Sequence, residues 1–173
     1  FANEYSKRAA MLMQTIKTKY WDNTRQLFAD TKEKVLFSQH TNTLAILTNI
    51  VKGEKATQLA QKIISDTSLT QATIYFQYYL NQALRKTGLG NLYLDRLQIW
   101  KDNVANGLTT WAEISDINAA RSDCHAWGAS PNIEFFRTVL GIDSDAPGFT
   151  KIRIEPHLST LKKAEGAMPH PKG

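Results

Sequence analysis

The sequence of 173 residues has few of the features that define several protein classes. Its single cysteine, Cys124, excludes an internal disulfide and a thiolate metal cluster. No apolar run approaches the roughly 18 residues of a membrane-spanning helix, and no signal peptide is visible at the start. The net charge of +5 comes from basic residues scattered along the chain. We therefore expect neither a membrane nor a nucleic acid as partner.

Metal and phosphate chemistry also lack their usual signals. The histidines are His40, His125, His157 and His170. None of them forms an HxxxH or CxxC spacing that would place two ligands on one helix face. A glycine-rich phosphate loop is absent too. The sequence predicts no metal site and no cofactor.

Helical periodicity dominates what is present. At 42% hydrophobic and 21% charged, the composition is that of a globular protein, and the length suits one domain. Partly enclosed helices alternate with one-sided helices, as expected for two layers of helices. No repeat of about 34 residues supports a tetratricopeptide array. Helices are predicted over residues 5–21, 38–52, 54–64, 70–88, 91–105 and 122–140.

The period changes to two near the C-terminus. Phe149, Ile152 and Ile154 alternate with charged residues, which predicts a strand, and a second short strand is expected over residues 164–168. Two short strands do not make a stable sheet. We therefore expect them to pair with a part of the protein outside this sequence.

A crowded connection, TTWAEISDINAARSDCHAW, covers residues 109–127. A carboxylate such as Glu113 beside tryptophans suits carbohydrate chemistry, because acids exchange protons with glycosidic oxygens or water. A solvated loop glutamate is the alternative interpretation. Cys124 and His125 do not form a nucleophile pair, since adjacent helical residues point about 100° apart. By itself, His125 is interpreted as a hydrogen-bonded structural residue.

Two further groups of polar and aromatic residues have ordinary structural interpretations. His40, in FSQHTNTLA, lies where capping and turn hydrogen bonds are expected. Tyr75 and Tyr79 share one face of a predicted helix and keep polar tips, but such residues more often belong to a core. The residue patterns alone predict a helical scaffold with one suggestive connection.

Several separated motifs, in order, resemble one enzyme family. The segments FSQHTNTLA, GLTTWAE, RSDCHAWGASPNIEFFRTVLGI, APGFTKIRIEPHL and AEGAMPHPKG are similar to the C-terminal part of the catalytic region of α-L-rhamnosidases, glycoside hydrolase family 78. The resemblance implies an (α/α)6 barrel, twelve helices in two layers, followed by a β-sandwich. With about six helices predicted, the chain is expected to be mainly α: about half of such a barrel with a short C-terminal β segment.

The resemblance also implies a mechanism and a set of site residues. These enzymes invert the anomeric centre with an acid and a base, and the family's TT-x-x-E pattern makes Glu113 the expected general base. His125 is an expected contact to rhamnose, Trp111 and Trp127 are expected aromatic walls, and His40 is a weaker candidate. The general acid is expected in the first half of the barrel, outside this chain, so the chain alone is expected to be inactive.

The same resemblance predicts the organisation and the partners. Residues 1–145 are expected to form the second half of the barrel, and residues 146–173 the first strands of a β-sandwich domain. The expected partners are a rhamnose-containing carbohydrate, the N-terminal half of the same polypeptide and a second copy bound through the exposed half-barrel. An extracellular or periplasmic location is favoured for the full-length protein. Two alternatives stay open: another glycosidase on the same barrel, and a helical carbohydrate-binding or interaction module without chemistry.

Overall fold

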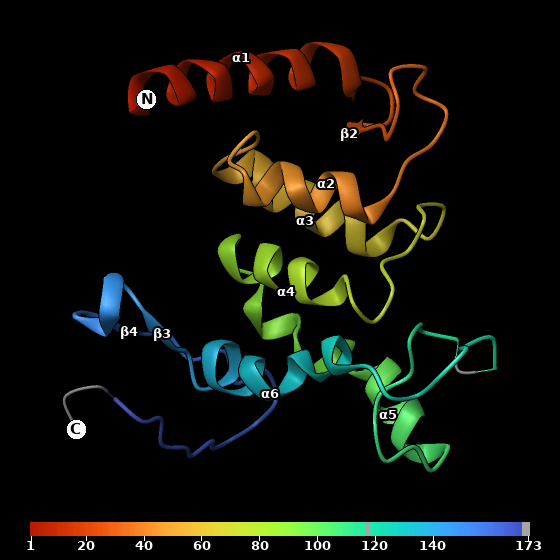
Figure 1. The fold of residues 1–173 in the computed structure, drawn as a ribbon, viewed down its shortest axis with the longest axis vertical. Helices are drawn as coiled ribbons and strands as arrows, with labels where there is room; N and C mark the ends of the chain where they lie inside the picture. The colour runs from red at the N-terminus through yellow and green to blue at the C-terminus, as the bar shows by residue number, and fades with distance from the viewer. Residues whose placement is uncertain (117, 171–173) are drawn as a thin grey trace. The chain divides into compact units, whose positions relative to one another are not determined.

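The computed structural model describes residues 1–116 and 118–170, and its chain divides into two compact units, Phe1–Ala72 and Thr73–Gly173. Helices predominate in both units, and the strands are two or three residues long (Figure 1). The α-helices of the described residues are α1 (Ala2–Tyr20), α2 (Gln39–Leu47), α3 (Glu54–Ser65), α4 (Gln77–Lys86), α5 (Gln98–Ala105) and α6 (Ser130–Glu134). The strands are β1 (Trp21–Asp22), β2 (Leu27–Phe28), β3 (Ile142–Ser144) and β4 (Ile152–Ile154).

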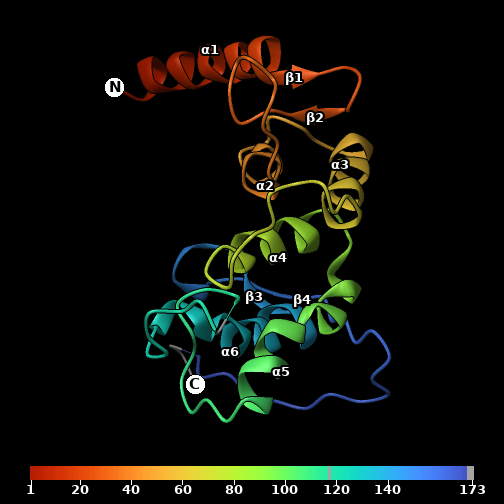
Figure 2. The same ribbon diagram turned by 90° about the vertical axis from the view of Figure 1, so that its right-hand side faces the viewer.

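In the first unit, α1 leads into a small hairpin. Strands β1 and β2 pair antiparallel (Figure 2). The rings of Trp21 and Phe28 meet edge to face, with their centroids 4.9 Å apart. The hairpin is joined to α2 by Asn42, which accepts a hydrogen bond from the N–H of Phe28 at 2.8 Å and donates one to its carbonyl at 2.9 Å. By contrast, α1 buries none of its residues. Its apolar stripe, including Leu12 at 63% exposure, is an open surface.

Helices α2 and α3 pack against each other in the first unit. The one-sided pattern predicted for α3 is confirmed, because Ala56, Leu59, Ala60 and Ile63 are its buried residues. The predicted extent of α2 is wrong at its end. The helix ends at Leu47, Asn49 takes a left-handed conformation with φ 62°, and Gly53 is the N-cap of α3 rather than the end of α2. Asn tolerates that conformation better than most residues, which allows the early turn.

The second unit begins with a shorter helix than predicted. Helix α4 starts at Gln77 and not at Thr70, because Thr70 is used in backbone pairing with the segment before α2: its N–H donates to Phe37 and its carbonyl accepts from Gln39, both at 3.0 Å. The end predicted at Gly88 is confirmed by its φ of 77° just after the helix. The buried apolar residues of α4 are Leu80, Ala83 and Leu84.

The region predicted as a fifth helix is divided. Two 3₁₀ turns, Gly90–Leu92 and Leu94–Arg96, precede α5. Tyr93 and Trp100 are buried, but Val104 is 63% exposed and lies outside the core. The apolar residues of this region are therefore buried at its start and exposed in the last turn of α5.

The helix predicted over residues 122–140 is confirmed only in its second part. A 3₁₀ turn, Ala126–Ala129, leads into α6, and a π-helical turn, Phe135–Val139, follows it. Pro131 lies in the first turn of α6, where its missing N–H has no helical partner to lose.

The C-terminal strands pair within the chain. Strand β3 pairs antiparallel with β4, with Ile142 opposite Ile154. β3 was not predicted, β4 lies within the predicted strand, and residues 164–168 form no strand. The expectation that β4 pairs outside this sequence is therefore incomplete. The predicted domain boundary at residue 145 falls between the two paired strands and stays a proposal. Residues 171–173 of the predicted second domain lie outside the described residues.

Candidate active site

The backbone before Glu113 is anchored to α5 by a buried side chain. Asn103 accepts a hydrogen bond from the N–H of Ala112 at 3.0 Å and donates one to the carbonyl of Ile99 at 2.8 Å. Asn103 and Ala112 are both fully buried. Glu113 therefore extends from a fixed point of the backbone, as a working side chain requires.

The chain doubles back after this point, and we name residues 110–125 the Glu113 segment. The N–H of Glu113 donates to the carbonyl of Ser122 at 3.0 Å. The N–H of His125 donates to the carbonyl of Trp111 at 3.1 Å. A helix starting at residue 122 would itself need the carbonyl of Ser122. The two bonds also bring Glu113 and His125 together.

The carboxylate of Glu113 forms a two-point ion pair with Arg121. The Nε of Arg121 donates to Oε2 of Glu113 at 2.9 Å, and its Nη2 donates to Oε1. The Glu113 side chain is 15% exposed, whereas that of Arg121 is 85% exposed. The hydrogen bonds from Arg121 lower the pKa of Glu113, and the charges of Arg121 and His125 act in the same direction. Glu113 is therefore ionised at neutral pH.

His125 contacts both Ser122 and the aromatic ring of Trp127. Its Nε2 lies 2.5 Å from the hydroxyl oxygen of Ser122, and its ring centroid lies 4.5 Å from that of Trp127. Trp127 is 46% exposed and meets the ring of Tyr75, equally exposed, at 6.0 Å. The prediction that Tyr75 belongs to the core is therefore wrong. An open edge of aromatic rings lies next to His125, and such edges suit the C–H faces of sugars.

Trp111 lies on the inner side of the same segment. Gly128 approaches it so closely that a Cβ at this glycine would overlap the Cβ of Trp111. On its other side, the carbonyl of Gly128 accepts a hydrogen bond from the indole N–H of the buried Trp100 at 2.6 Å. Trp111 therefore wedges the Glu113 segment against the start of α6, and it is less exposed than Trp127.

His40 is the one predicted site residue of the first unit. It lies in the first turn of α2, after Ser38, whose hydroxyl accepts the N–H of Thr41 at 3.3 Å and so caps the helix as predicted. Partial burial lowers the pKa of His40, and the charge of Asp30 opposes this effect. The neutral form of His40 is therefore favoured at neutral pH. The other four residues, Trp111, Glu113, His125 and Trp127, belong to the second unit.

Glu134 is a buried carboxyl group that the sequence did not single out. Thr138 donates its hydroxyl to Oε2 at 2.5 Å, and the amide of Gln82 donates to Oε1. Burial raises the pKa of Glu134, and burial together with the charge of Glu134 raises that of Tyr93. A raised carboxyl pKa often marks a catalytic acid, but Glu134 is fully buried, so its role is structural. Its place on the face of α6 that also buries Pro131 was the available signal.

Arg121 is the second residue that sequence reasoning missed. Its only signal was a cation in the same irregular connection as Glu113. The pairing depends on the chain doubling back, which no periodicity predicts.

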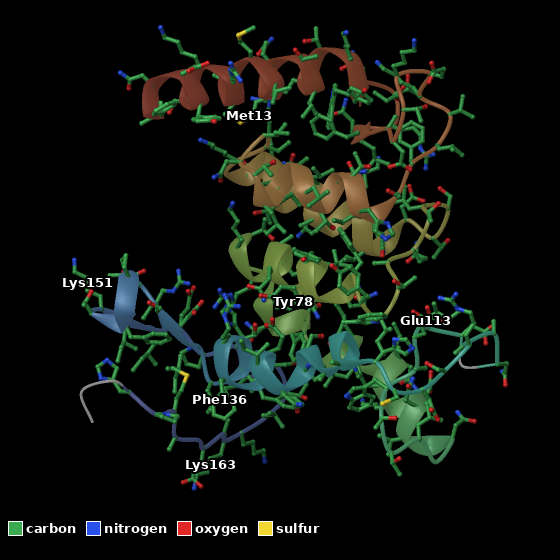
Figure 3. All side chains as sticks on the ribbon, in the orientation of Figure 1. Met13, Tyr78, Glu113, Phe136, Lys151 and Lys163 are labelled. Atoms are coloured by element: carbon green, nitrogen blue, oxygen red, sulfur yellow. The ribbon has the colours of Figure 1, made fainter. Side chains whose placement is uncertain are left out.

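Cavities accompany both units. One of about 390 Å³ lies behind the Glu113 segment, where Ala112 and Ser122 line it. One of about 940 Å³ lies in the first unit, under the side of α1 that carries Met13 (Figure 3). Among the described residues, neither lining includes the five predicted site residues. The candidate site residues of this chain therefore lie on an open surface rather than in an enclosed pocket.

Metal binding and membrane insertion find no support in the part of the chain that the structure describes. Within residues 1–116 and 118–170, no three histidine, cysteine or acidic side chains gather as metal ligands. No helix among these residues combines the length and apolar character needed to cross a bilayer. Cys124 is a free, exposed thiol.

Comparison with known proteins gives one family and two similar structures. The model of the bacterial alpha-L-rhamnosidase 6 hairpin glycosidase domain matches residues 2–139. The crystal structure of a GH78 family rhamnosidase of Bacillus sp. GL1 is similar over 99% of this chain, with 26% identity and a TM-score of 0.88. A rhamnosidase from Klebsiella oxytoca with rhamnose bound is similar over 78% of the chain, with 18% identity and a TM-score of 0.69. No curated protein matches the chain.

These likenesses confirm the predicted fold class and the family resemblance. The chain is mainly helical and corresponds to a region of an α/α barrel. It spans 20% of the length of the Bacillus enzyme and 28% of that from Klebsiella.

Proposed function

The chain belongs to the bacterial α-L-rhamnosidase six-hairpin glycosidase family, and on that premise we propose that it supplies the general-base side of an inverting α-L-rhamnosidase. The substrate is a glycoside or polysaccharide with a terminal α-L-rhamnose. The observation that carries the proposal is the ionised carboxylate of Glu113, held on an anchored segment beside His125 and Trp127. A base must be ionised to accept a proton from water, and Glu113 meets that condition.

The proposed reaction needs two carboxyl groups on opposite sides of the sugar. Glu113 takes a proton from a water molecule, whose oxygen forms the new bond to the anomeric carbon. The glycosidic C–O bond breaks, and the leaving oxygen receives its proton from a general acid. In inverting enzymes the two carboxyl groups lie roughly 6.5–9.5 Å apart to admit the water. Proton exchange with solvent then restores both groups.

The general acid is proposed to lie outside residues 1–173. Glu134 has the raised pKa that a general acid needs, but its carboxyl group is buried and already bonded to Gln82 and Thr138. It therefore cannot reach a leaving group without unfolding its surroundings. We expect the chain alone not to hydrolyse rhamnosides.

The sugar contacts are proposed from the same wall. His125 is placed to hydrogen-bond a rhamnose hydroxyl, and the exposed ring of Trp127 is placed to stack on the sugar. Trp111 is proposed as a second aromatic wall, and His40 is a weaker candidate for a contact to the sugar. Self-association through the exposed half-barrel stays a prediction.

The test is Glu113→Gln in the full-length polypeptide that contains this chain. The substitution keeps the shape and removes the base, so turnover of an aryl α-L-rhamnoside should fall on the order of 10²–10⁴-fold. Glu165→Gln, at a glutamate whose side chain is 77% exposed, is the matched control and should keep full activity. Azide should restore turnover of Glu113→Ala and give a glycosyl azide of inverted configuration. Near-normal turnover by Glu113→Gln would exclude Glu113 as the base.

A further inference from the structure

Arg121 differs in its ion-pair partner from three other arginines of the second unit. Arg85, Arg137 and Arg153 converge on Asp143, at 2.6, 3.3 and 3.6 Å, and so connect α4 and the turn after α6 to the hairpin of β3 and β4. Arg121 reaches only back along its own segment to Glu113. Exposed ion pairs of this kind contribute little to folding stability. The effect of Arg121 therefore falls on the carboxylate itself.

The geometry of the pair constrains the orientation of that carboxylate. Both oxygens of Glu113 accept from one planar guanidinium group, so the two planes are aligned. The position of Arg121 is set in turn by the backbone bond from Glu113 to Ser122, the next residue. Two contacts therefore fix Arg121 relative to Glu113: one through the backbone and one through the side chains.

The pair also leaves room for the reacting water. A carboxylate has about four lone-pair positions. The two side-chain bonds from Arg121 and a backbone hydrogen bond from the same residue occupy three of them, which leaves one for a hydrogen bond from water.

We propose that Arg121 is the positioning residue of the Glu113 base, fixing the plane of its carboxylate and keeping it ready to accept a proton from the attacking water. This inference rests on the proposed function. Arg121 does not touch the sugar in this role, and it acts through Glu113. A lysine would keep the positive charge near Glu113 but not the two-point hydrogen bonding. Substitution by lysine therefore separates the electrostatic effect of Arg121 from its effect on orientation.

The charged environment of Glu113 predicts the direction of its pH dependence. Two charged or titratable groups act on Glu113 from its own segment, Arg121 and His125. The neighbouring residue of α5 is the neutral Asn103, which accepts a hydrogen bond from the backbone of Ala112. Removal of Arg121 takes away the largest influence that lowers the pKa of Glu113. The acidic limb of activity should then move to higher pH, because Glu113 becomes protonated earlier on acidification.

The experiment compares Arg121→Gln and Arg121→Lys with wild type in the full-length polypeptide. For Arg121→Gln we expect kcat to fall about 10–100-fold with KM little changed, since a misplaced catalytic group costs up to about 10²-fold. The acidic limb of kcat/KM should shift to higher pH. Arg121→Lys should keep the acidic limb of wild type, because the charge remains, but recover only part of kcat. Arg8→Gln, which breaks an exposed arginine–glutamate pair on α1, is the matched control and should behave as wild type.

The outcomes separate this inference from the proposed function. If Glu113→Gln is inactive while Arg121→Gln keeps the kcat and pH profile of wild type, the positioning role is wrong and the base stands. If Glu113→Gln is active, the proposed function itself fails. A carbon-13 titration of the Glu113 carboxyl group gives a readout without substrate. Its midpoint should rise in Arg121→Gln and stay in Arg8→Gln, and an unmoved midpoint in Arg121→Gln would overturn the inference.

Discussion

Two glutamates of the second unit, Glu113 and Glu134, are held by hydrogen bonds yet differ in almost every physical respect. Glu113 lies on an irregular segment, pairs with an exposed arginine, and has a lowered pKa. Glu134 lies on α6, is fully buried, and has a raised pKa because burial disfavours its charged form. The comparison shows that a shifted pKa alone does not identify a catalytic carboxyl group. Access to substrate and water decides which of the two can react.

The neighbours of each glutamate explain the difference. Around Glu113 a charged donor with an 85% exposed side chain supplies both hydrogen bonds, so ionisation is favoured. Around Glu134 the donors are the neutral groups of Gln82 and Thr138, while Arg85 and Arg137 act from a greater distance and pair with Asp143. Neutral donors offset burial only in part. The buried glutamate therefore contributes to packing, and Glu113 is the one proposed to take part in the chemistry.

The largest expected effect on stability comes from deleting the buried carboxyl group. Glu134→Ala should lower the free energy of unfolding by about 3 kcal/mol, because it opens a cavity and leaves Gln82 and Thr138 without their acceptor. Glu113→Ala should lower the urea midpoint only slightly, because an exposed ion pair contributes little to stability. Urea unfolding of both variants measures the contrast. Equal destabilisation by the two substitutions would break the division between a structural and a functional glutamate.

A smaller loss is expected where the Glu113 segment is anchored. Asn103→Ala should cost about 2 kcal/mol, since the buried N–H of Ala112 loses its acceptor. Asn106→Ala, which removes an exposed bond to the carbonyl of Asp102, is the control and should have little effect. Urea unfolding separates the two. If Asn103→Ala is as stable as the control, α5 does not hold the segment and the backbone at Glu113 is not anchored.

The smallest expected effect is the pH dependence of stability, which should have opposite signs at the two glutamates. A raised folded pKa makes Glu134 lose stability as the pH rises above its unfolded value, near 4.5. Glu134→Gln cannot lose a proton, so its stability relative to wild type should rise as the pH is raised from 4 to 7.

Glu113 should show the reverse in the same series of unfolding measurements. Its folded pKa is lowered, so its pair with Arg121 stabilises above the unfolded value and is lost as the pH falls through the folded value. The free energy of unfolding of Glu113→Gln should therefore be slightly lower than that of wild type at neutral pH and equal to it in acid. A gain by Glu134→Gln that does not grow with pH would mean that Glu134 is ionised in the folded protein.

The sequence predicted the elements whose evidence is local. Helix α1 and the one-sided α3 follow their apolar period, and Gly88 follows α4 with a positive φ, as a helix end requires. The errors occur where distant backbone groups compete. Ser122 and His125 form backbone hydrogen bonds with Glu113 and Trp111, and Thr70 pairs with Phe37 and Gln39, so neither stretch is free to be helical. Strand β3 is too short for a period of two to be visible.

The sequence by itself determined the helical class, the family resemblance and the five candidate residues, because periodicity and motif order are local properties of the chain. Only the tertiary structure decided that Arg121 pairs with Glu113, that Trp127 and Tyr75 are half exposed, and that Glu134 is buried with a raised pKa. Ion pairing and burial depend on which residues the folded chain brings together. Two glutamates that look alike in sequence therefore acquire opposite protonation behaviour only after folding.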